Sequence, residues 1–298
     1  MARLREIKRR IRSVDNTKQI TKTMEMVAAA KIRRAQERIE AARPYALTMM
    51  NVLDNVGARV NVGKHPLLEI REPKKQTIII PMTSDRGLCG AFNTNIIRRT
   101  EKLAESERSD GSHVSIFAVG KKGINYFKYV GYDFVGEKKE ISDSPTYADA
   151  KDIASDLIKR YIEKSLDKVV VVFNHFKSAM EQKAIEHVLL PIKRQSVEAE
   201  ENEPSADYIF EPEDSEVLNH LLPAYVEALV YRALMESAAS EHGARRTAMK
   251  SATDNAIDMI AHLTRSFNRA RQAQITQEIS EIVGGAEALK DSLEAEQV

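Results

Sequence analysis

The chain has no tryptophan, a single cysteine and few aromatic residues, which make up 6% of its 298 positions. With only Cys89, it has no internal disulfide and no companion cysteines for a zinc site, which fits a reducing compartment. No run approaches the ~18 uninterrupted apolar residues that a membrane-spanning helix needs. The N-terminus, MARLREIKRR, lacks the apolar segment of a secretion signal. We therefore expect a cytoplasmic protein that reaches a membrane only through partners.

Motifs of the common enzyme classes are also missing. The sequence contains no HExxH, no GxSxG, no aspartate-rich metal loop and no pair of acids at a recognisable spacing. It therefore predicts no catalytic residue, no metal site and no cofactor. The seven histidines are scattered, and we expect His175 and His187 to be structural. Cys89 is expected to be a small, buried apolar residue rather than a reactive thiol.

Charge is distributed unevenly along the chain. A net charge of +1 conceals thirteen Lys and Arg against five acids in residues 1–43, whereas residues 276–298 are acidic. The basic face of the first segment includes Arg9, Arg10 and Lys18. Such a helix could bind nucleic-acid phosphates in a salt-dependent manner, although it lacks aromatic side chains for stacking. A solvated face, or a surface complementary to acidic protein loops, explains the same charge.

The N-terminal pattern predicts one long helix over residues 1–57. Its apolar or small residues alternate steps of four and three over about four heptads, the spacing of a coiled-coil seam. The same register places the polar Lys18, Thr21 and Glu25 at seam positions, which indicates selection for more than apolar packing. Pro44 predicts a bend and Gly57 predicts the helix end. The seam comprises Ala28, Ile32, Ala35, Ile39, Ala42, Ala46, Met49, Leu53 and Val56.

A second long helical pattern lies within residues 207–289. It begins after Asp214 and Ser215, either of which can cap a helix, and the glycines at 284 and 285 predict its end. Pro223 and Gly243 are weak points inside it. Its apolar positions are Leu218, Leu221, Tyr225, Ala228, Met235, Ala239, Met249, Ala256, Ile260, Leu263, Phe267 and Ala270, followed after a phase shift by Ile275, Ile279 and Ile282.

Helices of these lengths constrain the architecture. At 1.5 Å per residue they would be about 80 and 100 Å long, whereas a compact domain of about 130 residues has a radius of gyration near 14 Å. The chain's own globular part cannot enclose them. We therefore expect residues 1–57 and 207–289 to pair as a long antiparallel coiled coil that flanks an inserted domain. Two ordinary bundle helices are the alternative.

Residues 74–195 alternate between β-rich runs and helical patterns, which predicts a central Rossmann-like α/β domain with a mostly parallel sheet. The expected strands are 77–82, 114–119, 132–135, 168–174 and 184–190, and the expected helices are 93–105, 121–129 and 147–164. Only residues 176–183 separate the last two strands, so we expect a hairpin and one antiparallel edge.

Two glycine-bearing turns follow strands, at the position where α/β enzymes bind phosphates. They are TSDRGLCGAFN, residues 83–93, and GKKG, residues 120–123. Neither has the three glycines of a dinucleotide fingerprint or the GxxxxGK[ST] of a P-loop. We expect packed strand-to-helix turns, and keep an enzyme with unusual phosphate turns as the competing hypothesis.

Several segments resemble the gamma subunits of F-type ATP synthases. They are IRSVDNTKQITKTMEMVAAAKIRRAQ (11–36), SDRGLCGAFN (84–93), ARRTAMKSATDNA (244–256) and NRARQAQITQEISEIVGGAEAL (268–289). The resemblance covers the whole chain and is strongest at its ends. It implies a central-stalk rotor, without a catalytic site of its own, that couples rotation of a membrane ring to ATP synthesis or hydrolysis in an alpha/beta hexamer and regulates that activity. A coiled-coil protein that binds or tethers nucleic acid is the alternative function.

The resemblance also implies partners and contact residues. The partners are three alpha and three beta subunits, an epsilon subunit and the c-ring, at the cytoplasmic face of the bacterial inner membrane, with no nucleic acid and no direct small-molecule substrate. Residues 275–283 would turn in a hydrophobic collar of the hexamer. The foot on the ring would be residues 207–212, with Tyr208 and Phe210. The residues facing the beta subunits would be Met24, Arg271, Gln272, Thr276 and Glu278.

Overall fold

The computed structural model describes residues 2–59, 65–178, 181–192 and 214–295. Two helices dominate these residues, α1 (Ala2–Arg59) and α5 (Asp214–Ala295). The chain forms two compact units, which are described separately below. The terminal unit comprises residues 1–26 and 249–298, and the central unit comprises residues 27–248. The predicted foot, with Tyr208 and Phe210, lies outside the described residues.

Both helices continue through residues that weaken a helix. Pro44 lies inside α1, and Pro223 lies inside α5. The prediction that Gly284 and Gly285 end the second helix is wrong, because α5 continues to Ala295. Glycine in a helix interior costs only about 1 kcal/mol relative to alanine, and the good helix formers that follow, among them Ala286, sustain the helix. The first helix passes its predicted end at Gly57 by two residues.

The central unit contains a five-stranded sheet in the order β3-β2-β1-β4-β5. Its strands are β1 (Gln76–Pro81), β2 (His113–Val119), β3 (Asp133–Lys138), β4 (Lys168–Phe176) and β5 (Gln182–Leu190). Neighbouring strands are parallel except for the β4–β5 pair, which is antiparallel. This arrangement confirms the predicted mostly parallel sheet and its antiparallel edge. The prediction for β3 began one residue early and ended three residues early, because Gly136 and charged residues interrupt its apolar pattern.

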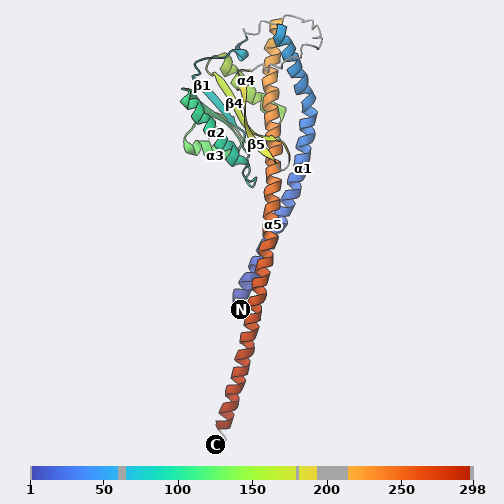
Figure 1. Cartoon of the computed structure of the whole chain (residues 1–298), viewed down its shortest axis with the longest axis vertical. Helices are drawn as coiled ribbons and strands as arrows, with labels where there is room; N and C mark the ends of the chain where they lie inside the picture. Colours follow the sequence, from blue (N-terminus) through green and yellow to red (C-terminus); the bar gives the residue numbers. More distant parts are fainter. Residues whose placement is uncertain (1, 60–64, 179–180, 193–213, 296–298) are drawn as a thin grey trace. The chain divides into compact units, whose positions relative to one another are not determined.

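Helices cover both faces of this sheet (Figure 1). On one face, α2 (Phe92–Ser109) and α3 (Lys121–Val130) pack against alternate strand residues such as Ile79, Ile116 and Val172. On the other face, α4 (Tyr147–Ile162) and part of α5 pack against the intervening residues, such as Ile80 and Val171. Successive side chains of a strand point to opposite faces, so the near-continuous apolar runs of β1 and β4 serve both cores.

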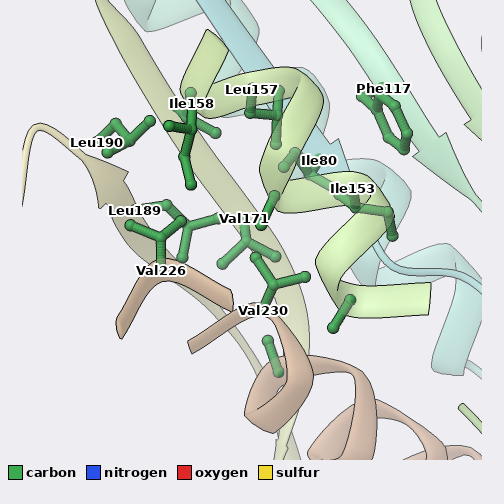
Figure 2. Packing of buried hydrophobic residues seen from close by; sticks show 14 of the residues in the cluster. Ile80, Phe117, Ile153, Leu157, Ile158, Val171, Leu189, Leu190, Val226 and Val230 are labelled. Carbon is green, nitrogen blue, oxygen red and sulfur yellow. The ribbon is translucent and has the colours of Figure 1, made fainter. Parts of the chain in front are cut away.

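The α5 helix packs on the sheet through a stripe that the predicted seam did not contain. Leu222, Val226 and Val230 are almost fully buried among α4 and the sheet. Figure 2 shows Val226 and Val230 next to Leu189 and Val171, with Ile153, Leu157 and Ile158 of α4 above them in this view. Within the central unit α5 therefore buries more than one face. A single seam with steps of three and four could identify only one of them.

Candidate partner interface

The terminal unit holds all the predicted beta-facing residues. Met24 is half-buried on α1, whereas Arg271, Gln272, Thr276 and Glu278 are exposed on α5. At 100° per residue, the four α5 residues fall within one half of the helix circumference, so α5 presents them on one side. Within the described ranges, no hydrogen bond or salt bridge links Met24 to any of these four residues.

Two of the three residues named for the predicted basic face are paired with neighbouring acids. Arg10 forms a 2.7 Å salt bridge with Glu6, and Lys18 forms a 2.6 Å salt bridge with Asp15. Arg9 is exposed. Exposed pairs of this kind contribute at most about 0.5 kcal/mol each, but they reduce the unpaired positive charge that a polyanion would meet.

A buried hydroxyl pair explains Thr21, one of the polar residues of the predicted seam. The Oγ1 atoms of Thr21 and Thr253 lie 2.8 Å apart, and the two residues are 8% and 7% exposed. The hydroxyls also lie within hydrogen-bond distance of the Lys18 and Met249 carbonyl oxygens, respectively. Because each hydroxyl has one hydrogen and two acceptor sites, the pair is satisfied without water. Thr253 was not singled out from the sequence, since nothing local distinguishes it from a surface threonine.

A hollow of ≈ 550 Å³ adjoins this hydroxyl pair in the terminal unit. Three lysines and two carboxylates lie along it, so its net charge is +1 (3 − 2), counted over its lining residues. Glu25, the third polar seam residue, forms a 3.1 Å salt bridge with Lys22. The lining residues are Lys18, Gln19, Lys22, Thr23, Glu25, Lys250, Thr253, Asp254 and Ile257.

The C-terminal part of α5 exposes an apolar stripe. Ile275, Ile279 and Ile282 follow the helical spacing of one face, and between 47% and 71% of each is exposed, as is much of Val283. Single exposed apolar residues are common, but a contiguous stripe on a helix indicates a surface that another molecule covers. The predicted collar contact falls on this stripe.

In the central unit, side chains occupy the donors at the two glycine-bearing turns. The Asp85 carboxylate accepts hydrogen bonds from the backbone N–H groups of Lys121 and Ser142, at 3.0 and 3.2 Å. These bonds oppose the effect of burial and hold the pKa of Asp85 below its usual value. Thr83 Oγ1 accepts a hydrogen bond from the Gly123 N–H. The first turn of α3 therefore directs its N–H groups at protein oxygens, and a negative carboxylate lies where a phosphate would bind.

Packing also closes these turns. A Cβ on Gly120 would lie 2.1 Å from the Thr83 carbonyl oxygen, so the two turns are in direct backbone contact. Cys89 is almost fully buried, which confirms its predicted burial, and burial raises the pKa of its thiol. Asn93 donates to its sulfur at 3.2 Å. The geometry agrees with packed turns rather than with a phosphate site.

A buried charged cluster joins α5 to the segment after β3 and to α1 within the central unit. Arg245 donates to Glu241 at 2.6 Å, and both side chains are nearly buried. His242 Nε2 lies 3.4 Å from the Asp143 carbonyl oxygen, and Asp143 also forms a salt bridge with Lys31. Burial raises the pKa of Glu241 and lowers the pKa of His242 to about 4. Sequence reasoning missed this cluster, because Asp143 and Lys31 lie about one hundred and two hundred residues from His242.

The pKa of His242 predicts a stability change with pH. Its value of about 4 lies below the ordinary 6.5, so the unfolded chain binds more protons between these values. The contribution of His242 to the free energy of unfolding is therefore fully present above pH 6.5. As the pH falls towards 4, the free energy of unfolding decreases by about 3 kcal/mol. The charged groups that act on His242 are Asp143, Arg245 and Lys31.

Urea unfolding of the wild type and a His242→Asn variant between pH 7.5 and 4 tests this expectation. The variant should be less stable at pH 7.5, and the difference between the two curves should shrink as the pH falls. Glu241 has a raised pKa, so its protonation changes stability in the opposite direction in both proteins. Taking the difference removes that contribution as long as its pKa is unchanged. Parallel curves would show that His242 does not titrate in this way.

The two histidines that the sequence singled out, His175 and His187, lie on β4 and β5, respectively. His175 Nδ1 lies 2.5 Å from a carboxylate oxygen of the buried Glu236 on α5. Burial lowers the pKa of His187. Among the described residues, no group of three His, Cys, Asp or Glu side chains is placed to hold a metal ion. No helix in the described ranges combines the length and the apolar character needed to cross a membrane.

Two long helices at the chain ends and a five-stranded α/β domain between them define the central-stalk class of fold. The family model for ATP synthase matches residues 3–289, and the chain belongs to the ATP synthase gamma chain family. It is 49% identical to the ATP synthase gamma chain of Desulforamulus reducens, over 97% of this chain and all of that one. The gamma chain of Heliobacterium modesticaldum is 48% identical with the same coverage.

Solved structures agree with this assignment. A chain from the central stalk and c-ring of the Tetrahymena thermophila mitochondrial ATP synthase is 27% identical, with a TM-score of 0.59, over 78% of this chain and 99% of that chain. A chain of the Euglena gracilis enzyme, at 20% identity and a TM-score of 0.66, covers 97% of this chain and 95% of its own length and shows the shared fold. The comparisons give no support to the nucleic-acid-binding alternative.

Proposed function

We propose that this chain is the central rotor subunit of a bacterial, proton-translocating F-type ATP synthase. It couples rotation of the membrane ring to ATP synthesis or hydrolysis in the alpha/beta hexamer and regulates that activity and proton flow. The observation that carries the proposal is a family relationship spanning residues 3–289, which includes both long helices and the sheet domain. The chain contributes no catalytic residue, cofactor or metal to the reaction.

Asymmetry gives such a rotor its function. A shaft that presents different faces to three otherwise identical catalytic subunits makes their nucleotide affinities unequal. Turning the shaft then takes each subunit through the same series of states, because contact with the shaft and nucleotide binding are linked free energies. Coupling in this scheme depends on the exposed faces of the terminal unit.

We assign the beta-subunit contacts to the exposed side of α5 that carries Arg271, Gln272, Thr276 and Glu278, and to Met24 of α1. The basic residues Arg9, Arg10 and Lys18 extend this surface. The apolar stripe of Ile275, Ile279 and Ile282 supports a contact with a hydrophobic collar. Burying this stripe would stabilise the complex by about 25 cal/mol for each Å² of apolar surface removed from water.

We further propose that residues 1–57 and 207–289 pair as an antiparallel coiled coil around the central domain, residues 74–195. The buried Thr21–Thr253 bond supports this pairing within the terminal unit. In the assembled enzyme the chain would bind three alpha and three beta subunits and an epsilon subunit. The foot, with Tyr208 and Phe210, would bind the c-ring. The chain would thus be a peripheral protein at the cytoplasmic face of the cell membrane.

Reconstitution tests the proposal. The purified chain is mixed with the alpha and beta subunits of the same enzyme, and the complex is isolated by gel filtration. We expect a stable complex in which ATP hydrolysis rotates a probe attached to the chain. Failure to form this complex, or hydrolysis without rotation, would contradict the proposed function.

Replacing Met24 with lysine is expected to reduce coupling more than assembly. The substitution places a charge on the half-buried surface assigned to the beta subunits. We expect protons pumped per ATP to fall by at least twofold, with the yield of assembled complex unchanged. The measurement is proton pumping and ATP hydrolysis in reconstituted vesicles.

Met26→Lys is the matched control for this experiment. Met26 is 58% exposed, and it lies about 200° around α1 from Met24, so the same charge is added to another face. Its pumping ratio should stay near the wild-type value. Equal losses in the two variants would show that the helix as a whole, and not the Met24 face, is sensitive to charge.

A further inference from the structure

Within the central unit, the segment between β3 and α4 contacts α1 through two side chains. Lys31 Nζ donates to both carboxylate oxygens of Asp143, at 2.7 and 2.5 Å, and Arg38 donates to Ser144 Oγ at 2.9 Å. Lys31 and Arg38 lie on the same face of α1 and are separated by about 10 Å along its axis. Their acceptors, by contrast, are adjacent in the chain. Side chains from two separate turns of α1 therefore converge on one point of this segment.

The first half of this segment is fixed to the sheet domain. Ile141 is buried in the core cluster that contains α4 and one face of the sheet. The Ser142 N–H donates to the Asp85 carboxylate at 3.2 Å, and the Asp85 N–H donates to Ser142 Oγ at 3.0 Å. We call residues 140–144 the strap. Its first half is anchored on the sheet domain, and its second half holds α1.

A chain of polar contacts continues from the strap into α5. His242 is 2% exposed, and its Nε2 lies 3.4 Å from the Asp143 carbonyl oxygen and 3.6 Å from a carboxylate oxygen of the same residue. Arg245 donates to Nδ1 of the imidazole at 3.4 Å, and it is also paired with Glu241. Because Nδ1 accepts a hydrogen bond, the proton of the neutral imidazole lies on Nε2 and faces Asp143. The strap is thus held from α5 as well as from α1.

The strap contacts the side of α1 and not its buried face. Ala28, Ile32 and Ala35 are buried. At 100° per residue, Lys31 and Arg38 lie roughly 80° around the helix from the mean direction of these three residues. Apolar packing is non-directional, so it holds the buried face in place but offers little resistance to rolling of the helix over that face. Polar contacts at the side of the helix oppose such rolling.

The ion pair between Lys31 and Asp143 is accessible to solvent. The two side chains are 35% and 50% exposed, so dissolved salt screens their attraction. Burial acts to raise the pKa of Asp143, but the Lys31 ammonium outweighs it and holds that pKa below its usual value. An exposed ion pair usually contributes little, because two flexible side chains must be ordered. Here the strap and His242 already orient Asp143, so mainly Lys31 loses freedom.

We propose that the strap is a releasable tie that holds α1 to the sheet domain, and that the Lys31–Asp143 ion pair closes it. With the pair formed, α1, α5 and the sheet domain of the central unit move as one body. When the pair is neutralised or screened, α1 rolls over its packed face while remaining in contact with its neighbours. The tie is a property of the chain itself, whereas its consequence for coupling rests on the proposed rotor function.

Distance measurements between two spin labels on the isolated full chain test the tie. Cysteines replace the exposed Arg34 of α1 and Lys151 of α4, and Cys89 is changed to serine so that only these two positions carry labels. Lys31→Met and Asp143→Asn each remove one charge with little change in size. Each should widen the distance distribution by about twofold, and the double variant should be no wider than either single variant, because both remove the same contact.

Controls separate the ion pair from other effects of substitution. Lys31→Arg keeps the charge and should retain the wild-type width. Arg33→Met is the matched control, because it breaks an exposed 3.1 Å pair with Glu37 inside α1, and it should also leave the width unchanged. Raising the salt concentration from about 0.1 to about 1 M shortens the Debye length from about 10 to about 3 Å. This should widen the wild-type distribution but not that of Lys31→Met. Equal widths in wild type and Lys31→Met, or equal widening by Arg33→Met, would overturn the proposal.

Proton pumping in reconstituted vesicles tests the consequence for coupling. Complexes that carry Asp143→Asn should assemble in wild-type yield but pump fewer protons per ATP, whereas complexes with Arg33→Met should match the wild type. A widened distance distribution with an unchanged pumping ratio would overturn the role of the strap in coupling. A wild-type chain that fails to assemble with the alpha and beta subunits would instead reject the rotor function. The distances in the isolated chain would still decide whether the tie exists.

Discussion

Replacing Gly120 with alanine is expected to destabilise the central unit by about 3–5 kcal/mol. Gly120 has φ = 88°, and a Cβ there would lie 2.1 Å from the Thr83 carbonyl oxygen and 2.6 Å from its carbonyl carbon. Both neighbours are backbone atoms, so no side-chain rotation relieves the overlap. The strand ends of β1 and β2 would have to separate, which would also break the Thr83 bonds to Val119 and Gly123.

Gly131→Ala separates overlap from backbone strain. Gly131 has φ = 87°, nearly the value at Gly120, but a Cβ there would have no atom within 4 Å. Its substitution should cost only about 1 kcal/mol, the penalty for alanine in the left-handed region. Urea unfolding of the isolated chain, followed by circular dichroism, measures both costs. Similar losses in the two variants would mean that the backbone contact with Thr83 contributes nothing.

Replacing Arg245 with methionine is expected to cost about 3–5 kcal/mol at pH 8. Arg245 is the cation that balances Glu241, whose side chain is 3% exposed. Methionine retains most of the apolar stem but leaves a carboxylate buried without its partner. The raised pKa of Glu241 should then rise further, so its folded form binds a proton that the unfolded form lacks. The loss should therefore be largest at high pH and should diminish as the pH falls.

Two further variants define the origin of this effect. Glu241→Gln combined with Arg245→Met should recover much of the lost stability, because no buried charge is left uncompensated. Arg10→Met breaks an exposed salt bridge with Glu6 and should change stability by less than about 0.5 kcal/mol. Denaturant unfolding at pH 5 and pH 8 measures all of them. A loss for R245M that is the same at both pH values would exclude Glu241 as its cause.

The sequence predicted those features that depend on local pattern. Apolar runs located the five strands, and the short gap between β4 and β5 identified the antiparallel edge. The prediction that the second helix ends at Gly284 and Gly285 was wrong. A helix tolerates the entropy cost of glycine where no competing cap is formed. Local composition shows how much a glycine costs a helix in free energy. It does not show whether the chain has a more stable conformation in which the helix ends.

The features that the sequence did not reveal depend on contacts between distant residues. Thr21 stood out as polar in an apolar seam, but its partner Thr253 lies 232 residues away. His242 and Glu241 look like surface residues of a charged helix until Asp143, Ser142 and Lys31 surround them. Periodicity describes one helix at a time. It cannot show that α5 meets the sheet, α4 and other segments at successive turns.

The paired hydroxyls of Thr21 and Thr253 have a mechanical consequence. If either helix slid along the other by one turn, about 5.4 Å, both hydroxyls would lose their partner across the helix interface. Each would then be left with only a bond to its own backbone, at a cost on the order of 1 kcal/mol per lost bond. Turning the two helices together as one body leaves the bond intact. The pair thus opposes sliding of the two helices along their axes but does not oppose their rotation as one rigid body.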